Sequence, residues 1–153
     1  METVYRKATA SDAQRICDLF TEMLRTIYNT DEVEGYEDGY LDRFFSTDSE
    51  DLIYVAQAGD EVVAFLSVEV HREEGYIYLD DLSVTDAYRS RGIGTKLIGM
   101  AEAYADEIGI IPVVFHVEKS NVRAHQLYKR LGYLDNEDQG SRMRMAKELR
   151  KVR

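Results

Sequence analysis

The sequence predicts one mixed α/β domain over residues 1–153, in which helices cover both faces of a single sheet. The length suits one domain, because a chain of this size buries enough surface to hold its own core. Strand-like apolar runs alternate along the chain with segments in which apolar residues recur at helical spacing. The sequence contains no internal repeat and no Pro- or Ser-rich linker that would divide it.

The first part of the chain predicts a strand and two helices. Residues 4–7 read as a short strand, and Ser11 with Gln14 has the spacing of a capping box, which begins a helix. A second, shorter helix is expected within residues 37–45. The first helix has one apolar face, made by Ile16, Leu19, Phe20, Met23, Leu24 and Ile27.

Three strands are expected next. Residues 52–58 and 61–70 are rich in β-branched residues and meet at Gly59-Asp60, which predicts a hairpin. Residues 76–84 form a third run of the same kind.

After Gly94 the apolar spacing becomes helical, and it remains so until Gly109 ends the helix. The remaining elements are a strand at 111–117, a helix from Asn121 to Gly132 and a strand at 143–145.

Charge is distributed unevenly. The chain has 29 acidic and 19 basic residues and a net charge of -10, which argues against general binding to nucleic acid or to an anionic membrane. Residues 1–75 contain 18 acidic and 6 basic residues, whereas residues 76–153 contain 11 acidic and 13 basic residues. The densest acidic stretch, residues 30–42, is either solvated surface or a rim that attracts cationic amines.

Cysteine and histidine usage excludes several kinds of site. Cys17 is the single cysteine, so it forms no internal disulfide and reads as a small apolar residue in a reducing compartment. No second histidine or cysteine stands at ligand spacing, and no metal is predicted. The longest nearly apolar run, residues 108–115, is far shorter than the roughly 20 residues of a membrane span, and the start lacks a signal-peptide core. A cytoplasmic protein is therefore expected.

The segment between the third long strand and its helix indicates phosphate binding. It contains two glycines and two arginines, and the free N–H groups of a helix start favour a phosphate. Two known loops do not fit, because a dinucleotide motif requires Gly where Leu97 stands and a P-loop requires G-K-[ST] where the chain has Gly94-Thr95-Lys96.

The motif Arg89-x-x-Gly92-x-Gly94 resembles the R/Q-x-x-G-x-G/A signature of the GNAT superfamily, the acyl-CoA-dependent N-acetyltransferases. Asn121 and Tyr128 fall on one helical face, as they do in that family, and residues 128–133 resemble its Y-x-x-x-G-F/Y. The resemblance covers nearly the whole chain and implies a central, mostly antiparallel sheet. It is weakest from residue 27 to residue 50, the part that in this family lies over the acceptor.

The resemblance also implies how acetyl-CoA is bound as cosubstrate. The backbone of Leu82, Ser83 and Val84 would pair with the pantetheine arm as an added strand would. Asn121 would hydrogen-bond the arm, and Tyr128 would lie near the thioester sulfur and protonate the leaving thiolate. The pyrophosphate would be held near Arg89 by the N–H groups of Arg91, Gly92, Ile93, Gly94 and Thr95.

A base is also required, because an alkyl ammonium has a pKa of about 10.4 and must lose a proton before it attacks. Asp80 and Asp81 are adjacent in a strand and should point to opposite faces. Asp80 shares its face with Leu82, and the stretch resembles that of diamine acetyltransferases, so Asp80 is the expected base, directly or through a water. A strand irregularity would exchange the two roles; His116, or water alone, remains an alternative.

The predicted function is transfer of an acetyl group from acetyl-CoA to a primary amine of a small cationic molecule, by direct attack in a ternary complex. Acetylation of a protein N-terminus or lysine is one alternative, and a CoA-binding regulatory module without turnover is another. The resemblance also makes a homodimer possible, since dimers are common in the family.

Overall fold

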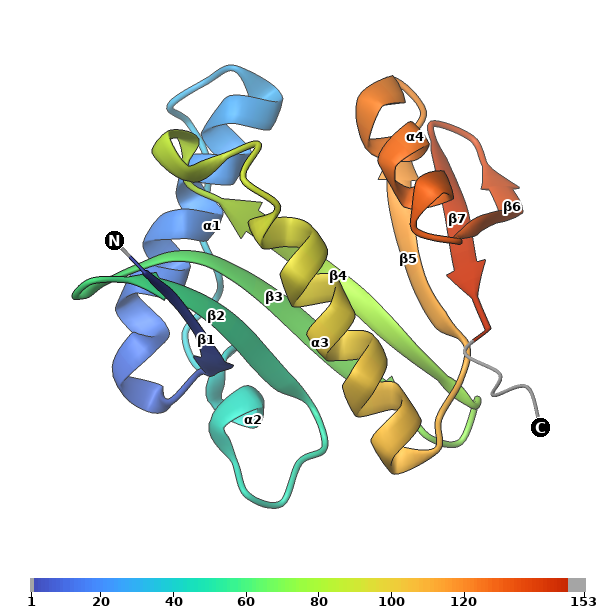
Figure 1. Cartoon of the computed structure of the whole chain (residues 1–153). Helices are drawn as coiled ribbons and strands as arrows, with labels where there is room; N and C mark the ends of the chain where they lie inside the picture. The colour runs from blue at the N-terminus through green and yellow to red at the C-terminus, as the bar shows by residue number, and fades with distance from the viewer. Residues whose placement is uncertain (1, 149–153) are drawn as a thin grey trace.

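The computed structural model describes residues 2–148 as a seven-stranded sheet with helices on both faces (Figure 1). The strand order is β1-β2-β3-β4-β5-β7-β6, and every neighbouring pair is antiparallel except β4 and β5. The predicted fold class is confirmed. The elements are β1 (Thr3–Lys7), α1 (Ala13–Tyr28), α2 (Asp42–Phe45), β2 (Leu52–Ala58), β3 (Glu61–His71), β4 (Tyr76–Val84), α3 (Ile93–Ile108), β5 (Val113–Glu118), α4 (Val122–Arg130), β6 (Leu134–Gln139) and β7 (Arg142–Lys147).

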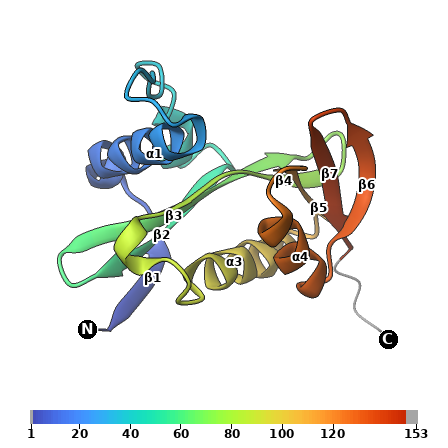
Figure 2. The same cartoon turned by 90° about the horizontal axis from the view of Figure 1, so that it is seen from above.

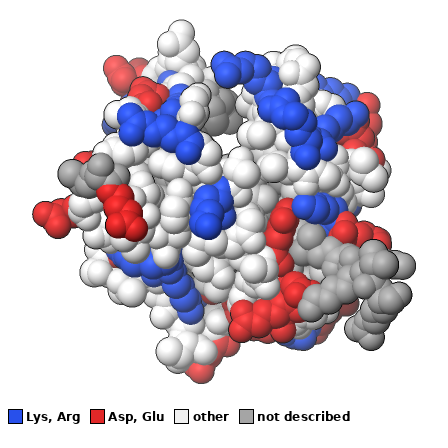
Figure 3. Space-filling view, viewed as in Figure 1, with Lys and Arg blue, Asp and Glu red and all other residues white. Residues whose placement is uncertain are grey.

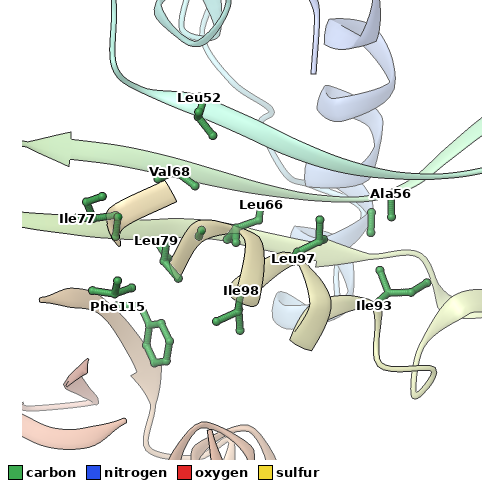
Figure 4. Close-up of a cluster of buried hydrophobic side chains, with 14 of the residues drawn as sticks. Leu52, Ala56, Leu66, Val68, Ile77, Leu79, Ile93, Leu97, Ile98 and Phe115 are labelled. Carbon is green, nitrogen blue, oxygen red and sulfur yellow. The ribbon is translucent and has the colours of Figure 1, made fainter. Parts of the chain in front are cut away.

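Two apolar cores lie on the two faces of the sheet. Figure 2 shows α1 on one side and α3 on the other. Ile16 and Leu19 of α1 are fully buried against β2 and β3, and Leu97 and Ile98 of α3 are buried against the opposite face (Figure 4). Burial of each such side chain contributes about 1.5–3 kcal/mol to the stability of the fold. The predicted apolar faces of α1 and α3 therefore hold the two helices against the sheet.

The helix start and two strands differ from the prediction. The capping box is formed by Thr9 and Asp12, two residues before the expected pair Ser11 and Gln14. The Thr9 N–H donates to Asp12 Oδ2 at 2.8 Å, and the Arg6 guanidinium holds the same carboxylate. Strand β6 was not predicted, because its side chains are almost all exposed and show no apolar alternation. Strand β5 begins at Val113, two residues later than expected.

The functional consequence of the topology lies between β4 and β5. These strands pair only at Ile77 with Val113 and at Tyr78 with Val114. Beyond that point β4 continues along β3 while β5 continues along β7, and the two strands diverge (Figure 1). The sheet is therefore open at the ends of β4 and β5, next to the loop before α3 and the start of α4.

Candidate active site

Three adjoining hollows lie in the opening between β4 and β5. Two outer hollows measure about 400 and 450 Å³, and an inner one measures about 40 Å³. Asn121 and Ile27 border both outer hollows, Leu82 borders the inner and one outer hollow, and Tyr128 and His116 border the inner and the other. Because they share these lining residues, the hollows adjoin one another.

The edge of β4 that faces this opening pairs with no described strand, and its Val84 carbonyl accepts from Arg89 Nε at 3.0 Å. Leu82, Ser83 and Val84 pair with β3 on one side, and no described strand pairs with them on the other. The Ser83 hydroxyl points away, donating to the Leu19 carbonyl at 3.1 Å. An extended chain that carries amide groups can add to such an edge by backbone hydrogen bonds.

The loop before α3 has the backbone geometry of an anion site. Gly92 is the N-cap of α3 with φ 79°, a left-handed conformation that favours glycine, and it caps the helix with no side chain. A Cβ at Gly92 would meet nothing within 4 Å, whereas one at Gly94 would lie 3.5 Å from Leu82 Cδ2. The first N–H groups of the helix are thus accessible to an anion.

The predicted arginines flank this loop. Arg89 borders one outer hollow and forms an ion pair with Asp86 at 3.0 Å, and Arg91 lies 4.9 Å over the ring of Tyr88. In Figure 3 basic side chains lie over this loop and over α4, on the two sides of the opening. This face therefore suits the phosphates of a cosubstrate.

Asn121 at the start of α4 and Tyr128 within it both border the opening. Asn121 caps the helix, since its Oδ1 accepts from the Ala124 N–H at 3.2 Å, and its amide NH₂ group is the part that can donate to a ligand. The Tyr128 ring packs on Phe115 with centroids 4.4 Å apart. Its hydroxyl has no hydrogen-bond partner within residues 2–148, and burial raises its pKa. The phenol is therefore kept protonated and can act as a donor.

The two aspartates do not point to opposite faces, which corrects the prediction. Leu82 pairs with Leu66 and Leu79 pairs with Val68, so Asp80 and Asp81 together face Ser67 in a β-bulge. The extra residue breaks the alternation on which the prediction rested. Both carboxylates therefore meet the same aromatic pair, Tyr36 and Tyr40.

That aromatic pair comes from the acidic segment before α2. The Tyr36 hydroxyl donates to Asp81 Oδ2 at 2.6 Å, and the Tyr40 hydroxyl lies 3.5 Å from Asp80 Oδ2. The two rings are stacked with centroids 4.7 Å apart. Sequence reasoning missed both tyrosines, because Tyr36 lies before the helix predicted within residues 37–45 and the contacts of both with β4 are long-range.

Electrostatics at this end of the opening favour a cation. Desolvation and repulsion from Asp81 and Glu69 raise the pKa of Asp80 to about 7. Burial also raises the pKa of Asp81. Glu69 forms an ion pair with Arg43 at 2.9 Å, whereas Asp80 and Asp81 form no ion pair with a Lys or Arg within residues 2–148. A bound ammonium group would relieve the remaining repulsion.

His116 lies in the same opening and is bound to Tyr78, a residue that the sequence analysis did not single out. The Tyr78 hydroxyl and His116 Nδ1 are 2.6 Å apart. His116 Nε2 is buried and has no hydrogen-bond partner in the described chain. Burial, Arg142 and Arg144 lower the pKa of His116, so the ring is neutral at pH 7 and can accept a proton.

Cys17, by contrast, packs against the core under α1. Burial and the neighbouring Asp18 raise the pKa of its thiol, which keeps it protonated and a poor nucleophile.

A free strand edge that leads to an anion-binding helix start suits an acyl-CoA thioester, since the pantetheine arm carries amides and its far end carries phosphates. The fold and this opening together define a class, the acyl-CoA transferases. Residues 21–133 match the family described as Acetyltransferase (GNAT) family, and the chain belongs to that family. It is an acetyltransferase that uses acetyl-CoA as its cosubstrate.

Individual relatives are similar to the chain in sequence, and a solved structure shares its fold. The chain is 29% identical over 140 residues to the uncharacterized N-acetyltransferase YhfO of Bacillus subtilis, covering 88% of this chain and 91% of that one. It is 32% identical over 105 residues to human N-alpha-acetyltransferase 30, and the match covers 62% of this chain and 27% of the human protein. The crystal structure of PaiA N-acetyltransferase from Thermoplasma acidophilum in complex with coenzyme A superposes on the chain with a TM-score of 0.78 at 19% sequence identity. The superposition covers 97% of this chain and 99% of that one.

No helix within residues 2–148 is long and apolar enough to cross a membrane. The same residues contain no group of three or more His, Cys, Asp or Glu side chains that could hold a metal ion.

Proposed function

We propose that this protein acetylates the primary amine of a small cationic molecule, by direct attack on acetyl-CoA within a ternary complex. The observation that carries the proposal is the group formed by Asp80, Asp81 and Glu69 beside the stacked tyrosines. These carboxylates repel one another, and a polyvalent amine would bind among them with its charges matched.

The cosubstrate would lie along the free edge of β4. Leu82, Ser83 and Val84 would pair with the pantetheine arm, and Asn121 would donate its amide NH₂ to it. The N–H groups from Arg91 to Thr95 would hold the pyrophosphate, with Arg89 beside them. The thioester would then lie next to the unpartnered Tyr128 hydroxyl.

In the reaction, Asp80 would take a proton from the ammonium group of the acceptor, directly or through a water. A carboxyl with a pKa of about 7 is ionised often enough at neutral pH to do so and basic enough to make the transfer efficient. The neutral nitrogen then bonds to the acetyl carbonyl carbon and the C–S bond breaks. Tyr128 would donate its proton to the departing thiolate, and the second proton that the nitrogen loses as the amide forms would return to the Tyr128 oxygen. The raised pKa of Cys17 is consistent with this route, in which no acetylated cysteine forms.

His116 is the second candidate for the proton acceptor. His116 borders the same inner hollow as Asp80 and Tyr128, and its buried Nε2 has no partner within residues 2–148. Nε2 can accept a proton in the tautomer whose Nδ1–H donates to the Tyr78 oxygen. A buried polar atom without a partner costs stability, which a substrate or a water at that position would recover.

A second function, acetylation of a protein N-terminus, is favoured by the similarity to human N-alpha-acetyltransferase 30. The two proposals predict different acceptors. An extended peptide needs few acidic contacts beside its α-amine, whereas the group around Asp81 suits an acceptor with a second positive charge.

The experiment is a panel of acceptors assayed for CoA release with saturating acetyl-CoA. The panel would contain diamines, monoamines, aminoglycosides, amino acids and short peptides of varied N-terminal residue. Turnover of diamines or other polycations above all others supports the first proposal. Preference for peptides supports the second, and binding of acetyl-CoA without any turnover would indicate a regulatory module.

A further inference from the structure

The inner hollow extends from the reaction centre into the core on the α3 face. Leu66 of β3 and Ile98 of α3 are 1% and 2% exposed, and they form its deepest wall. Leu79 and Phe115, from β4 and β5, close its sides, and Figure 4 shows the four side chains around a common space. The wall is therefore apolar and comes from four different elements.

The outer end of this hollow meets the groups that the proposed function assigns to the reaction. Asp80, His116 and Tyr128 border it, and two of them also border an outer hollow. A thioester held beside Tyr128 would have its acyl chain directed toward the apolar wall.

We propose that this inner hollow is the acyl-chain pocket and that Leu66 and Ile98 restrict the cosubstrate to the shortest acyl groups. This inference rests on the position proposed above for the thioester. The volume of about 40 Å³ is roughly three times the 10–15 Å³ that one water requires by the same measure. An acetyl group has three heavy atoms besides the sulfur and fits, whereas a hexanoyl chain does not.

The surrounding packing prevents the pocket from widening. The Phe115 ring lies between Tyr128 and Tyr133, with centroids 4.4 and 4.5 Å away. The Tyr133 hydroxyl donates to Glu102 of α3 at 2.7 Å, which ties this aromatic group to the helix that carries Ile98. Close-packed interiors accommodate added methylene groups poorly.

Calorimetric binding of CoA, acetyl-CoA, butyryl-CoA and hexanoyl-CoA tests the pocket without any acceptor. Acetyl-CoA should bind a few-fold more tightly than CoA, because its methyl group is buried. Hexanoyl-CoA should bind no more tightly than CoA. If none of the four binds, the assignment of the cosubstrate site fails; if affinity rises with every added methylene, the site stands and the pocket proposal fails.

The variant Ile98→Ala enlarges the deepest wall, and Leu97→Ala is its matched control. Leu97 is the neighbouring residue of α3 and is 0% exposed, but it does not border the hollow. Ile98→Ala should strengthen butyryl-CoA binding relative to acetyl-CoA, by about fourfold for each methylene admitted. Leu97→Ala should leave that ratio unchanged.

The ratio of the two affinities does not depend on the fraction of protein that is folded, so partial destabilisation does not obscure the result. Should Ile98→Ala misfold, Ile98→Val gives the same comparison with a smaller enlargement. An unchanged ratio in a folded Ile98 variant, or an equal change in Leu97→Ala, would overturn the proposal.

Discussion

The Tyr36 hydroxyl donates a 2.6 Å hydrogen bond to Asp81, and this contact joins the acidic segment before α2 to the bulge in β4. Tyr36 also stacks on Phe20 of α1 with centroids 3.9 Å apart, which fixes its ring. The segment in which the sequence shows no motif thus reaches the reaction centre.

Tyr36→Phe removes that hydrogen bond and keeps the ring. The bond lowers the pKa of Asp81 against the effect of burial, so its loss should make the carboxyl less acidic and weaken its attraction for a cation. We expect a several-fold higher KM for a diamine and an unchanged Kd for acetyl-CoA. Tyr28→Phe, at an exposed residue of α1, is the control and should leave both constants unchanged.

Tyr128→Phe tests the proton donor. A group that donates only in the transition state lowers kcat and leaves ground-state binding intact, so we expect kcat to fall by roughly a hundredfold with little change in acetyl-CoA affinity. Tyr104→Phe is the control, because that hydroxyl donates to the Glu50 carbonyl outside the opening. A loss of acetyl-CoA affinity equal to the loss of kcat would instead assign Tyr128 to binding.

The pH dependence of kcat/KM separates Asp80 from His116. A base must be deprotonated, so the rate should rise with pH through the pKa of that base. For Asp80 the rise is centred at about 7, and Asp80→Asn should remove it. For His116 the rise lies below the usual pKa of histidine, and His116→Gln should remove it. A profile that neither substitution alters would exclude both side chains as the base.

Gly92→Ala tests the anion site against a matched glycine at the other end of the same helix. Gly92 and Gly109 have φ of 79° and 73°, and a Cβ at either would meet nothing within 4 Å, so both substitutions introduce similar backbone strain. Gly92→Ala should raise the acetyl-CoA Kd at least tenfold, about 1.4 kcal/mol, because it disturbs the N–H groups that hold the pyrophosphate. Equal effects of Gly92→Ala and Gly109→Ala would refute the assignment.

The apolar periodicity predicts most of the fold because α1 and α3 each have one buried face. It does not predict β6, whose side chains are exposed and carry no pattern. The site is predictable where a motif marks it, as at Gly92, Asn121 and Tyr128. It is not predictable where a bulge alters side-chain direction, as at Asp80, or where long-range contacts bring residues together, as for Tyr36 and for Tyr78 with His116. The homodimer and the cytoplasmic location remain predictions.

The central claim is that the carboxylates beside Tyr36 and Tyr40 select an acceptor with a second positive charge. The most direct measurement is the ratio of kcat/KM for a four-carbon diamine to that for butylamine, in the native chain and in Asp81→Asn, with saturating acetyl-CoA. The account predicts a ratio of at least about ten, or 1.4 kcal/mol, in the native chain, and a ratio several-fold smaller in Asp81→Asn. Equal use of the two amines, or a preference for the diamine that survives the substitution, would contradict it.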